Sequence, residues 1–124
     1  MAEAPNLAGH RVLVVEDEQL IGLMLADVLE EFGCAVLGPV ATVAEAIALV
    51  EREDVTAALL DLSLRGETVY PVADRLVARS IPFVFITGYT RGALVPRHAA
   101  APVLTKPFSP TQLAEMVAQQ GWSR

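Results

Sequence analysis

The chain has 124 residues, of which 53% are hydrophobic and 19% charged, and this composition argues for one globular domain and against a disordered chain. Its formal net charge of −6 argues against nucleic-acid binding, which draws most of its affinity from a basic face. No uninterrupted apolar run approaches the length of a membrane span and the first residues lack a secretory signal pattern, so we expect a cytoplasmic protein that does not bind a membrane.

Apolar, β-branched segments bounded by turn residues predict five strands along the chain. The second of them contains Pro39, which predicts a strand at the edge of a sheet because proline has no N–H to donate. The strands are expected at residues 11–16, 35–40, 56–62, 82–87 and 102–105.

Helical patterns fill the intervals between these strands. Residues 18–32 place their apolar side chains on one face of a helix. Capping residues predict two further helix starts, at Thr42 with Glu45 three positions on, and at Ser109 with Gln112 three positions on. We also expect a helix at residues 70–80, a loop at residues 63–68 and room for only a short helix within residues 88–100.

Strands that alternate with helices predict a doubly wound α/β fold around a five-stranded parallel sheet. The carboxyl ends of parallel strands share one edge of the sheet, and such folds place their sites there. Acidic, hydroxyl and ammonium side chains therefore converge on one cleft. The residues at the strand ends are Glu16 and Asp17 after the first strand, Asp61 after the third, Thr87 and then Gly88 after the fourth, and Lys106 and then Pro107 after the fifth.

Carboxylates that meet at one edge repel one another, so the sequence implies a bound cation. Mg²⁺ fits because it takes hard oxygen ligands, and these strand ends offer no cysteine or histidine for zinc or copper. We expect Asp17 and Asp61 to be direct ligands and the backbone carbonyl of Ser63 to be a third. Glu16 fits either a ligand that acts through water or a bystander.

Lys106 and Thr87 add the groups that phosphoryl transfer needs. The ammonium is a point charge for one phosphoryl oxygen, and the hydroxyl can donate to another. A carboxylate can attack phosphorus when a metal and a lysine neutralise the charge, and Asp61 is the one carboxylate that we expect to have a metal, the Thr87 hydroxyl and the Lys106 ammonium within reach. Asp61 is therefore the expected phosphoacceptor, with Gly88 leaving space for the incoming group.

The ordered set Glu16-Asp17, Asp61, Thr87 and Lys106-Pro107 resembles the receiver domain of two-component response regulators. The resemblance implies a flavodoxin-like sheet with strand order 2-1-3-4-5. It also implies Mg²⁺ dependence, self-catalysed dephosphorylation, and a phosphoryl group received from a histidine kinase or a histidine phosphotransfer protein. The peptide bond between the lysine and the proline is often cis in the family.

The resemblance covers residues 10–120, so we expect a receiver domain there, an N-terminal extension at residues 1–9, a C-terminal tail at residues 121–124, and no output domain. Output would then be a contact with a downstream protein, best placed on the last helix and the loop before it, or onward phosphotransfer. We expect no separate small-molecule reaction, and either a monomer or a weak homodimer.

One position departs from the family pattern. Val103 stands where receivers usually carry an aromatic residue, three positions before the lysine. The stretch FVFITGYTRG is similar to the F-x-T-G-Y loop of a subgroup of single-domain receivers, and Tyr89 is the nearest aromatic candidate. We therefore predict a switch at Thr87, Gly88 and Tyr89 in which phosphorylation reorders residues 88–98. The alternative is that Tyr89 is a surface ring.

Some residues receive structural interpretations. Glu18 is expected in the first turn of a helix, where an acid favours the helix dipole. His10 and His98 show no partner pattern and are expected at the surface. Arg65 stands where many receivers have a proline, so the loop there should differ in stiffness. The single cysteine, Cys34, is expected to be a small buried thiol in a reducing compartment.

Three other functions compete with this interpretation. An interaction module that works without phosphorylation is favoured by Val103 but disfavoured by the complete set of site residues. A stand-alone Mg²⁺-dependent phosphatase would need an Asp-x-Asp loop on its first strand, where this chain has adjacent acids. A nucleotide- or flavin-binding protein would need a phosphate loop at that place, and the acids would repel its anionic ligand.

Overall fold

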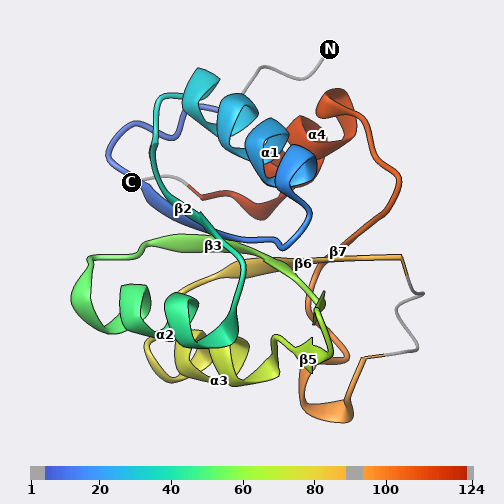
Figure 1. Ribbon diagram of the computed structural model, residues 1–124. Coiled ribbons are helices and arrows are strands. Elements are labelled where there is room, and N and C mark those ends of the chain that lie inside the picture. Colours follow the sequence, from blue (N-terminus) through green and yellow to red (C-terminus); the bar gives the residue numbers. More distant parts are fainter. Residues whose placement is uncertain (1–4, 89–93, 123–124) are drawn as a thin grey trace.

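The computed structural model describes residues 5–88 and 94–122 (Figure 1). Its centre is a five-stranded parallel sheet in the order β2-β1-β3-β6-β7, which confirms the doubly wound fold and the strand order that the resemblance implied. Strand β2, which contains Pro39, lies at an edge of the sheet, as predicted. The strands are β1 (Arg11–Val15), β2 (Ala35–Val40), β3 (Ala57–Asp61), β6 (Phe83–Thr87) and β7 (Val103–Thr105).

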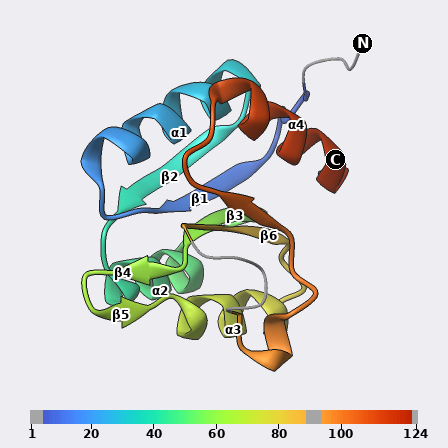
Figure 2. The ribbon, with the colours of Figure 1, turned by 90° about the vertical axis from the view of Figure 1, so that its right-hand side faces the viewer.

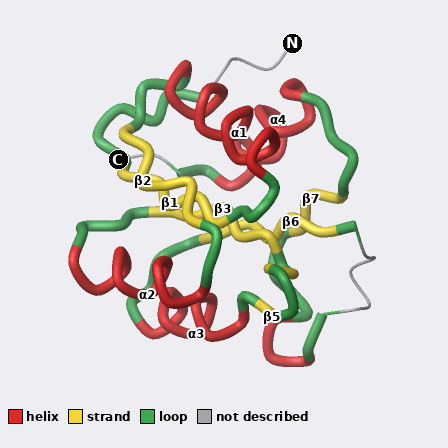
Figure 3. Tube along the Cα trace, in the orientation of Figure 1, coloured by secondary structure: helices red, strands yellow, loops and turns green. Residues whose placement is uncertain are grey.

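Helices cover both faces of this sheet (Figures 1 and 3). One face carries α1 (Gln19–Glu31) and α4 (Pro110–Gln120), and the other carries α2 (Val43–Arg52) and α3 (Tyr70–Ala78). Both predicted helix starts are confirmed, because the side chains of Thr42 and Ser109 each accept the backbone N–H three residues on. Within the described ranges, no helix has the length and apolar character needed to span a bilayer.

Alternate residues of the central strands enter two separate cores. In β1, Leu13 and Val15 pack with α2 and α3, whereas Val12 and Val14 pack with α1 and α4. All four of these side chains are fully buried. Burial on both faces is what the uninterrupted apolar run predicts, and it fixes the strand whose carboxyl end carries the acids.

The segment at residues 63–68, predicted as a loop, contains two short strands instead. Strands β4 (Ser63–Leu64) and β5 (Glu67–Thr68) pair as an antiparallel hairpin that stands clear of the main sheet (Figure 2). Arg65 and Gly66 form its two-residue turn, and both have positive φ, which matches the twist of a tight hairpin. In the described part of residues 88–100, the expected short helix is the 3₁₀ helix η2 (Pro96–His98).

The prediction that His10 and His98 lie at the surface is wrong, since their side chains are buried. His10 Nδ1 shares a hydrogen bond of 2.7 Å with Thr56 Oγ1. His98 Nε2 lies 2.8 Å from Asp74 Oδ1, and its ring stacks on that of Tyr70 at 5.6 Å between centroids. These hydrogen-bonding partners lie 46 and 24 residues away along the chain, so the local sequence could not reveal them.

Candidate functional site

The strand-end residues meet at one edge of the sheet, as the parallel arrangement requires. A cavity of about 500 Å³ opens there. The described residues that line it come from the ends of β1, β3, β6 and β7 and from the β4–β5 hairpin: Asp17, Glu18, Asp61, Ser63, Arg65, Gly66, Thr87, Gly88 and Lys106.

Three carboxylates gather at this cavity. One oxygen from each of Glu16, Asp17 and Asp61 lies within 4.8 Å of the other two. Glu16 and Asp61 are only 3% and 4% exposed, so water screens their charges poorly. Backbone N–H groups offset part of this charge. Glu16 Oε2 accepts the N–H of Glu18 at 3.0 Å, and Asp61 Oδ1 accepts that of Ser63 at 3.3 Å.

Lys106 brings a positive charge to these acids from the end of β7. Its Nζ lies 3.3 Å from Asp61 Oδ2 and 3.4 Å from Glu16 Oε1. It also donates to Glu18 Oε1 at 3.1 Å. Burial lowers the pKa of this ammonium, but the hydrogen bond to Glu18 and the nearby carboxylates outweigh burial, so the pKa is raised. Lys106 is therefore charged throughout the physiological pH range.

Glu16 is the carboxyl most affected by its surroundings. Burial raises the pKa of Glu16 to about 8, and a hydrogen bond with Asp61 and the charge of that residue act in the same direction. The Glu18 N–H and Lys106 act against the rise without cancelling it. Carboxylates outnumber cations at this edge, so the site accommodates the excess by holding a proton or by attracting a further cation.

The donor set fits a divalent cation. Three carboxylates offer hard oxygens, and no sulfur or imidazole is among the described residues that line the cavity. Oxygen ligands of this kind are those that Mg²⁺ takes. Asp17 and Asp61 would hold the ion, with Glu16 beside them, and Ser63 lines the same cavity. A dication there would also offset the repulsion that favours the protonated form of Glu16.

Two of the three predicted switch residues lie at the site. Thr87, the last residue of β6, is 2% exposed, and Gly88 follows it in the lining of the cavity. Tyr89 lies outside the described residues. Val103 is half-buried in β7, where it pairs with Phe85 across the parallel ladder. The Lys106–Pro107 peptide is cis, as the resemblance implied.

Sequence reasoning missed the roles of two residues at this edge. Glu18 is the N-cap of α1 without a side-chain capping bond, so its interpretation as a helix-dipole acid is incomplete, and its carboxylate instead contacts Lys106. Arg65 donates its backbone N–H to Asp17 Oδ2 at 3.1 Å. The two contacts join residues 88 and 48 positions apart, and no local pattern signals them.

The chain belongs to the response regulator receiver domain family, whose sequence profile matches residues 12–118. Among solved structures it is similar to SdrG from Sphingomonas melonis Fr1, with 46% sequence identity, a TM-score of 0.77, and coverage of 88% of this chain and 93% of that chain. It is also similar to the response regulator PhyR from Brucella abortus, with 30% identity, a TM-score of 0.80, and coverage of 93% of this chain and 48% of that chain.

A curated relative is the transcriptional regulatory protein PdtaR from Mycobacterium tuberculosis, which is 32% identical over 115 residues. The match covers 90% of this chain and 56% of PdtaR. The chain therefore spans about half the length of the curated relatives that it matches.

Proposed function

We propose that Asp61 accepts a phosphoryl group from a histidine kinase or a histidine phosphotransfer protein in a Mg²⁺-dependent reaction, and that the phosphorylated chain signals through a protein contact or passes the group on. The observation that carries this proposal is the position of Asp61. Its carboxylate is buried and lies 3.3 Å from the Lys106 ammonium. One of its oxygens lies within 4.8 Å of oxygens of Glu16 and Asp17, close enough for the three to bind one metal ion. Membership of the receiver family supports the same chemistry.

In the proposed reaction a bond forms between an Asp61 carboxylate oxygen and phosphorus, while the bond from phosphorus to the donor histidine nitrogen breaks. Lys106 would contact a phosphoryl oxygen and offset the charge that the group brings. Mg²⁺, when bound, would supply further charge neutralisation. The Asp61 phosphoryl group would later be lost to water in a self-catalysed step, as the family resemblance implies.

The phosphodonor would approach from the carboxyl edge of the sheet. On α1, beside this edge, Leu20 and Leu23 are 82% and 48% exposed. Leu23 also lines a second cavity together with Glu16 and Asp17. These side chains offer apolar area to a protein that brings a phosphohistidine to Asp61.

The signal would leave the site through the end of β6. Thr87 would donate its hydroxyl to the phosphoryl group and move toward it, and Gly88 would follow. We infer that this movement reorders residues 88–98, because Val103 cannot provide the aromatic switch usual in the family. NMR order parameters for residues 88–98, of which 89–93 lie outside the described residues, test the inference when measured with and without a phosphoryl mimic, and unchanged values throughout contradict it.

The test of the phosphorylation itself is mass spectrometry. The chain is incubated with acetyl phosphate and Mg²⁺, and we expect an acid-stable, base-labile mass gain that disappears in Asp61→Asn. The matched control is Asp54→Asn, which removes an exposed carboxylate outside the site. A solved relative supports this expectation, since SdrG has been determined in a BeF₃-activated conformation.

The outcome separates the two leading functions. A mass gain in the wild-type chain and in the control, but not in the Asp61 variant, supports the proposal. No gain with acetyl phosphate and none with a histidine kinase would overturn it in favour of an interaction module that works without phosphorylation. This second function is favoured by Val103, which stands where receivers usually carry the aromatic switch residue.

A further inference from the structure

The turn of the β4–β5 hairpin contains an arginine where the backbone favours another residue. Arg65 has φ of 41° and Gly66 has φ of 88°, so both residues are left-handed. Glycine, asparagine and aspartate are the usual residues at such positions, because glycine has no Cβ to clash with the backbone and the short polar side chains of asparagine and aspartate can hydrogen-bond locally. The turn itself therefore gives no reason for an arginine at position 65.

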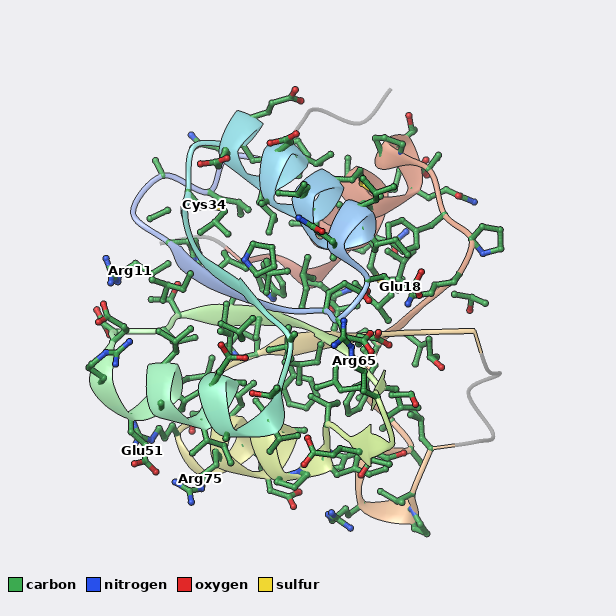
Figure 4. All side chains as sticks on the ribbon, viewed as in Figure 1. Arg11, Glu18, Cys34, Glu51, Arg65 and Arg75 are labelled. Carbon is green, nitrogen blue, oxygen red and sulfur yellow. The ribbon has the colours of Figure 1, made fainter. Side chains whose placement is uncertain are left out.

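Arg65 contacts the acidic site through its side chain as well as through its backbone. Its backbone N–H donates to Asp17 Oδ2 at 3.1 Å, and its guanidinium Nε lies 3.8 Å from the same oxygen. Arg65 lines both the site cavity and the neighbouring cavity beside Glu16 and Leu23. Figure 4 shows Arg65 at the same end of the sheet as Glu18, whereas Arg75 and Glu51 lie away from it on the outer side of α2 and α3.

The two donors of Arg65 have different consequences for a cation at Asp17. A backbone N–H leaves the carboxylate with free lone pairs, so it is compatible with a bound metal. The guanidinium is a full positive charge that a dication repels. Because the side chain of Arg65 is 76% exposed, it can turn out into water when the metal enters.

We propose that Arg65 is a resident cation of the site, whose guanidinium competes with the metal for Asp17 and so weakens Mg²⁺ binding before phosphorylation. This inference rests on the proposed Mg²⁺-dependent function. At this edge of the sheet, Arg65 and Lys106 face the four carboxylates Glu16, Asp17, Glu18 and Asp61. Removing the guanidinium leaves a more negative site, which attracts a dication more strongly.

The test is a Mg²⁺ titration followed by the amide resonances of the cavity residues, with Gly88 as one reporter. Trp122 fluorescence is unsuitable, because this single tryptophan lines a different cavity with His10. The main variant is Arg65→Asn, which keeps the backbone donor and suits a positive φ. We expect it to bind Mg²⁺ about two- to five-fold more tightly than the wild type, the range typical of one exposed ion pair.

Two further variants separate charge at this position from other effects. Arg65→Lys keeps the charge and should bind Mg²⁺ with nearly the wild-type affinity. Arg75→Gln removes an exposed arginine that pairs with Glu51 outside the site, and it should leave the affinity unchanged. The gain in Arg65→Asn should also shrink as the salt concentration rises, because salt screens an exposed charge.

An unchanged or weaker affinity in Arg65→Asn overturns the inference. So does an Arg65→Lys chain that binds as tightly as Arg65→Asn, because the guanidinium charge would then not be the cause. Both results leave the Mg²⁺ site of the wild type intact. If the wild-type chain shows no Mg²⁺-dependent shift at all, the proposed metal dependence fails, and this inference fails with it.

Discussion

Two clusters of charged side chains in this molecule look alike but behave differently. At the carboxyl edge of the sheet, Lys106 contacts three carboxylates. On the outer side of α3, the single carboxylate of Asp74 accepts two hydrogen bonds from Arg97, at 2.9 and 3.0 Å, and contacts His98 at 2.8 Å. In the Lys106 cluster the carboxylates outnumber the cations, and we call it unbalanced. In the Asp74 cluster the single carboxylate has at least one cation, and we call it balanced.

The pKa values of the carboxyl groups follow this difference. The hydrogen bonds from Arg97 hold the pKa of Asp74 below its ordinary value. Burial raises the pKa of Glu16 to about 8, and the neighbouring Asp61 adds to the rise. A balanced cluster ties structural elements together, here η2 to α3. A cluster in which carboxylates outnumber cations has an excess of negative charge, and pKa values perturbed by such an excess are typical of functional sites.

The largest expected effect tests whether the unbalanced cluster performs chemistry. Lys106→Met should slow the phosphorylation of Asp61 by acetyl phosphate about a hundredfold or more, because the variant loses the charge that would stabilise the incoming phosphoryl oxygens. The rate of the mass gain measures this effect. Lys106→Arg is the charge-preserving control and should retain part of the rate. Equal rates in Lys106→Met and the wild type would show that the lysine has no such role.

A second effect concerns pH. The pKa of Glu16 is about 8 in the folded chain, above its ordinary value of 4.5. The folded state therefore holds the Glu16 proton more tightly than the unfolded state does. The stability that this proton contributes is fully present below pH 4.5 and is lost as the pH rises through about 8. In the presence of a chelator, we expect the free energy of unfolding to fall by roughly 2 kcal/mol between about pH 6 and about pH 9. Urea unfolding at several pH values measures the fall.

The control for this pH effect is Glu16→Gln, which has no proton to lose and should flatten the profile. Saturating Mg²⁺ should also reduce the fall in the wild type, because a dication stabilises the ionised carboxylate. A wild-type stability profile as flat as that of Glu16→Gln would contradict the raised pKa of Glu16.

A third effect tests whether Asp17 is a ligand of the metal. Asp17→Asn should weaken Mg²⁺ binding by about tenfold, because it replaces a charged oxygen ligand with a neutral one. The same NMR titration that tests Arg65 measures it, with Asp54→Asn as the matched control. If both variants bind Mg²⁺ as the wild type does, Asp17 is not a ligand.

The smallest effect concerns the balanced cluster. Asp74→Asn should lower the free energy of unfolding by no more than about 1 kcal/mol, because the Asp74 side chain is 46% exposed and water screens its charge. Phosphorylation and Mg²⁺ affinity should not change. A variant that loses phosphorylation while it remains folded would show that the two clusters are coupled.

Short-range patterns in the sequence predict the α/β fold and the place of the site, whereas the strand order came from the family resemblance. Apolar runs such as the one at Val12–Val15 mark buried strands, and the parallel sheet brings their carboxyl ends together. Acids and a lysine that follow such runs must therefore meet. This reasoning reaches Asp17, Asp61 and Lys106 without any knowledge of side-chain contacts.

The same reasoning fails where a residue acts through a distant partner. His98 appears isolated in the sequence, yet a stacked tyrosine and an aspartate bury it against α3. Arg65 is noticeable only as an unusual residue in a loop, and its contact with Asp17 depends on a hairpin that no strand pattern predicts. Pairings of this kind depend on tertiary packing, which overrides local preference.

Lys106 is also the only lysine in the sequence. Amine-directed reagents such as acylating agents would therefore modify one amine side chain, and that side chain lies beside the proposed phosphoacceptor Asp61. Only the deprotonated amine reacts, and the surrounding acids raise the pKa of Lys106, so they protect it. Its rate of labelling would measure how strongly the acids hold that proton, and a ligand that shields the acids should be visible as a change in chemical reactivity.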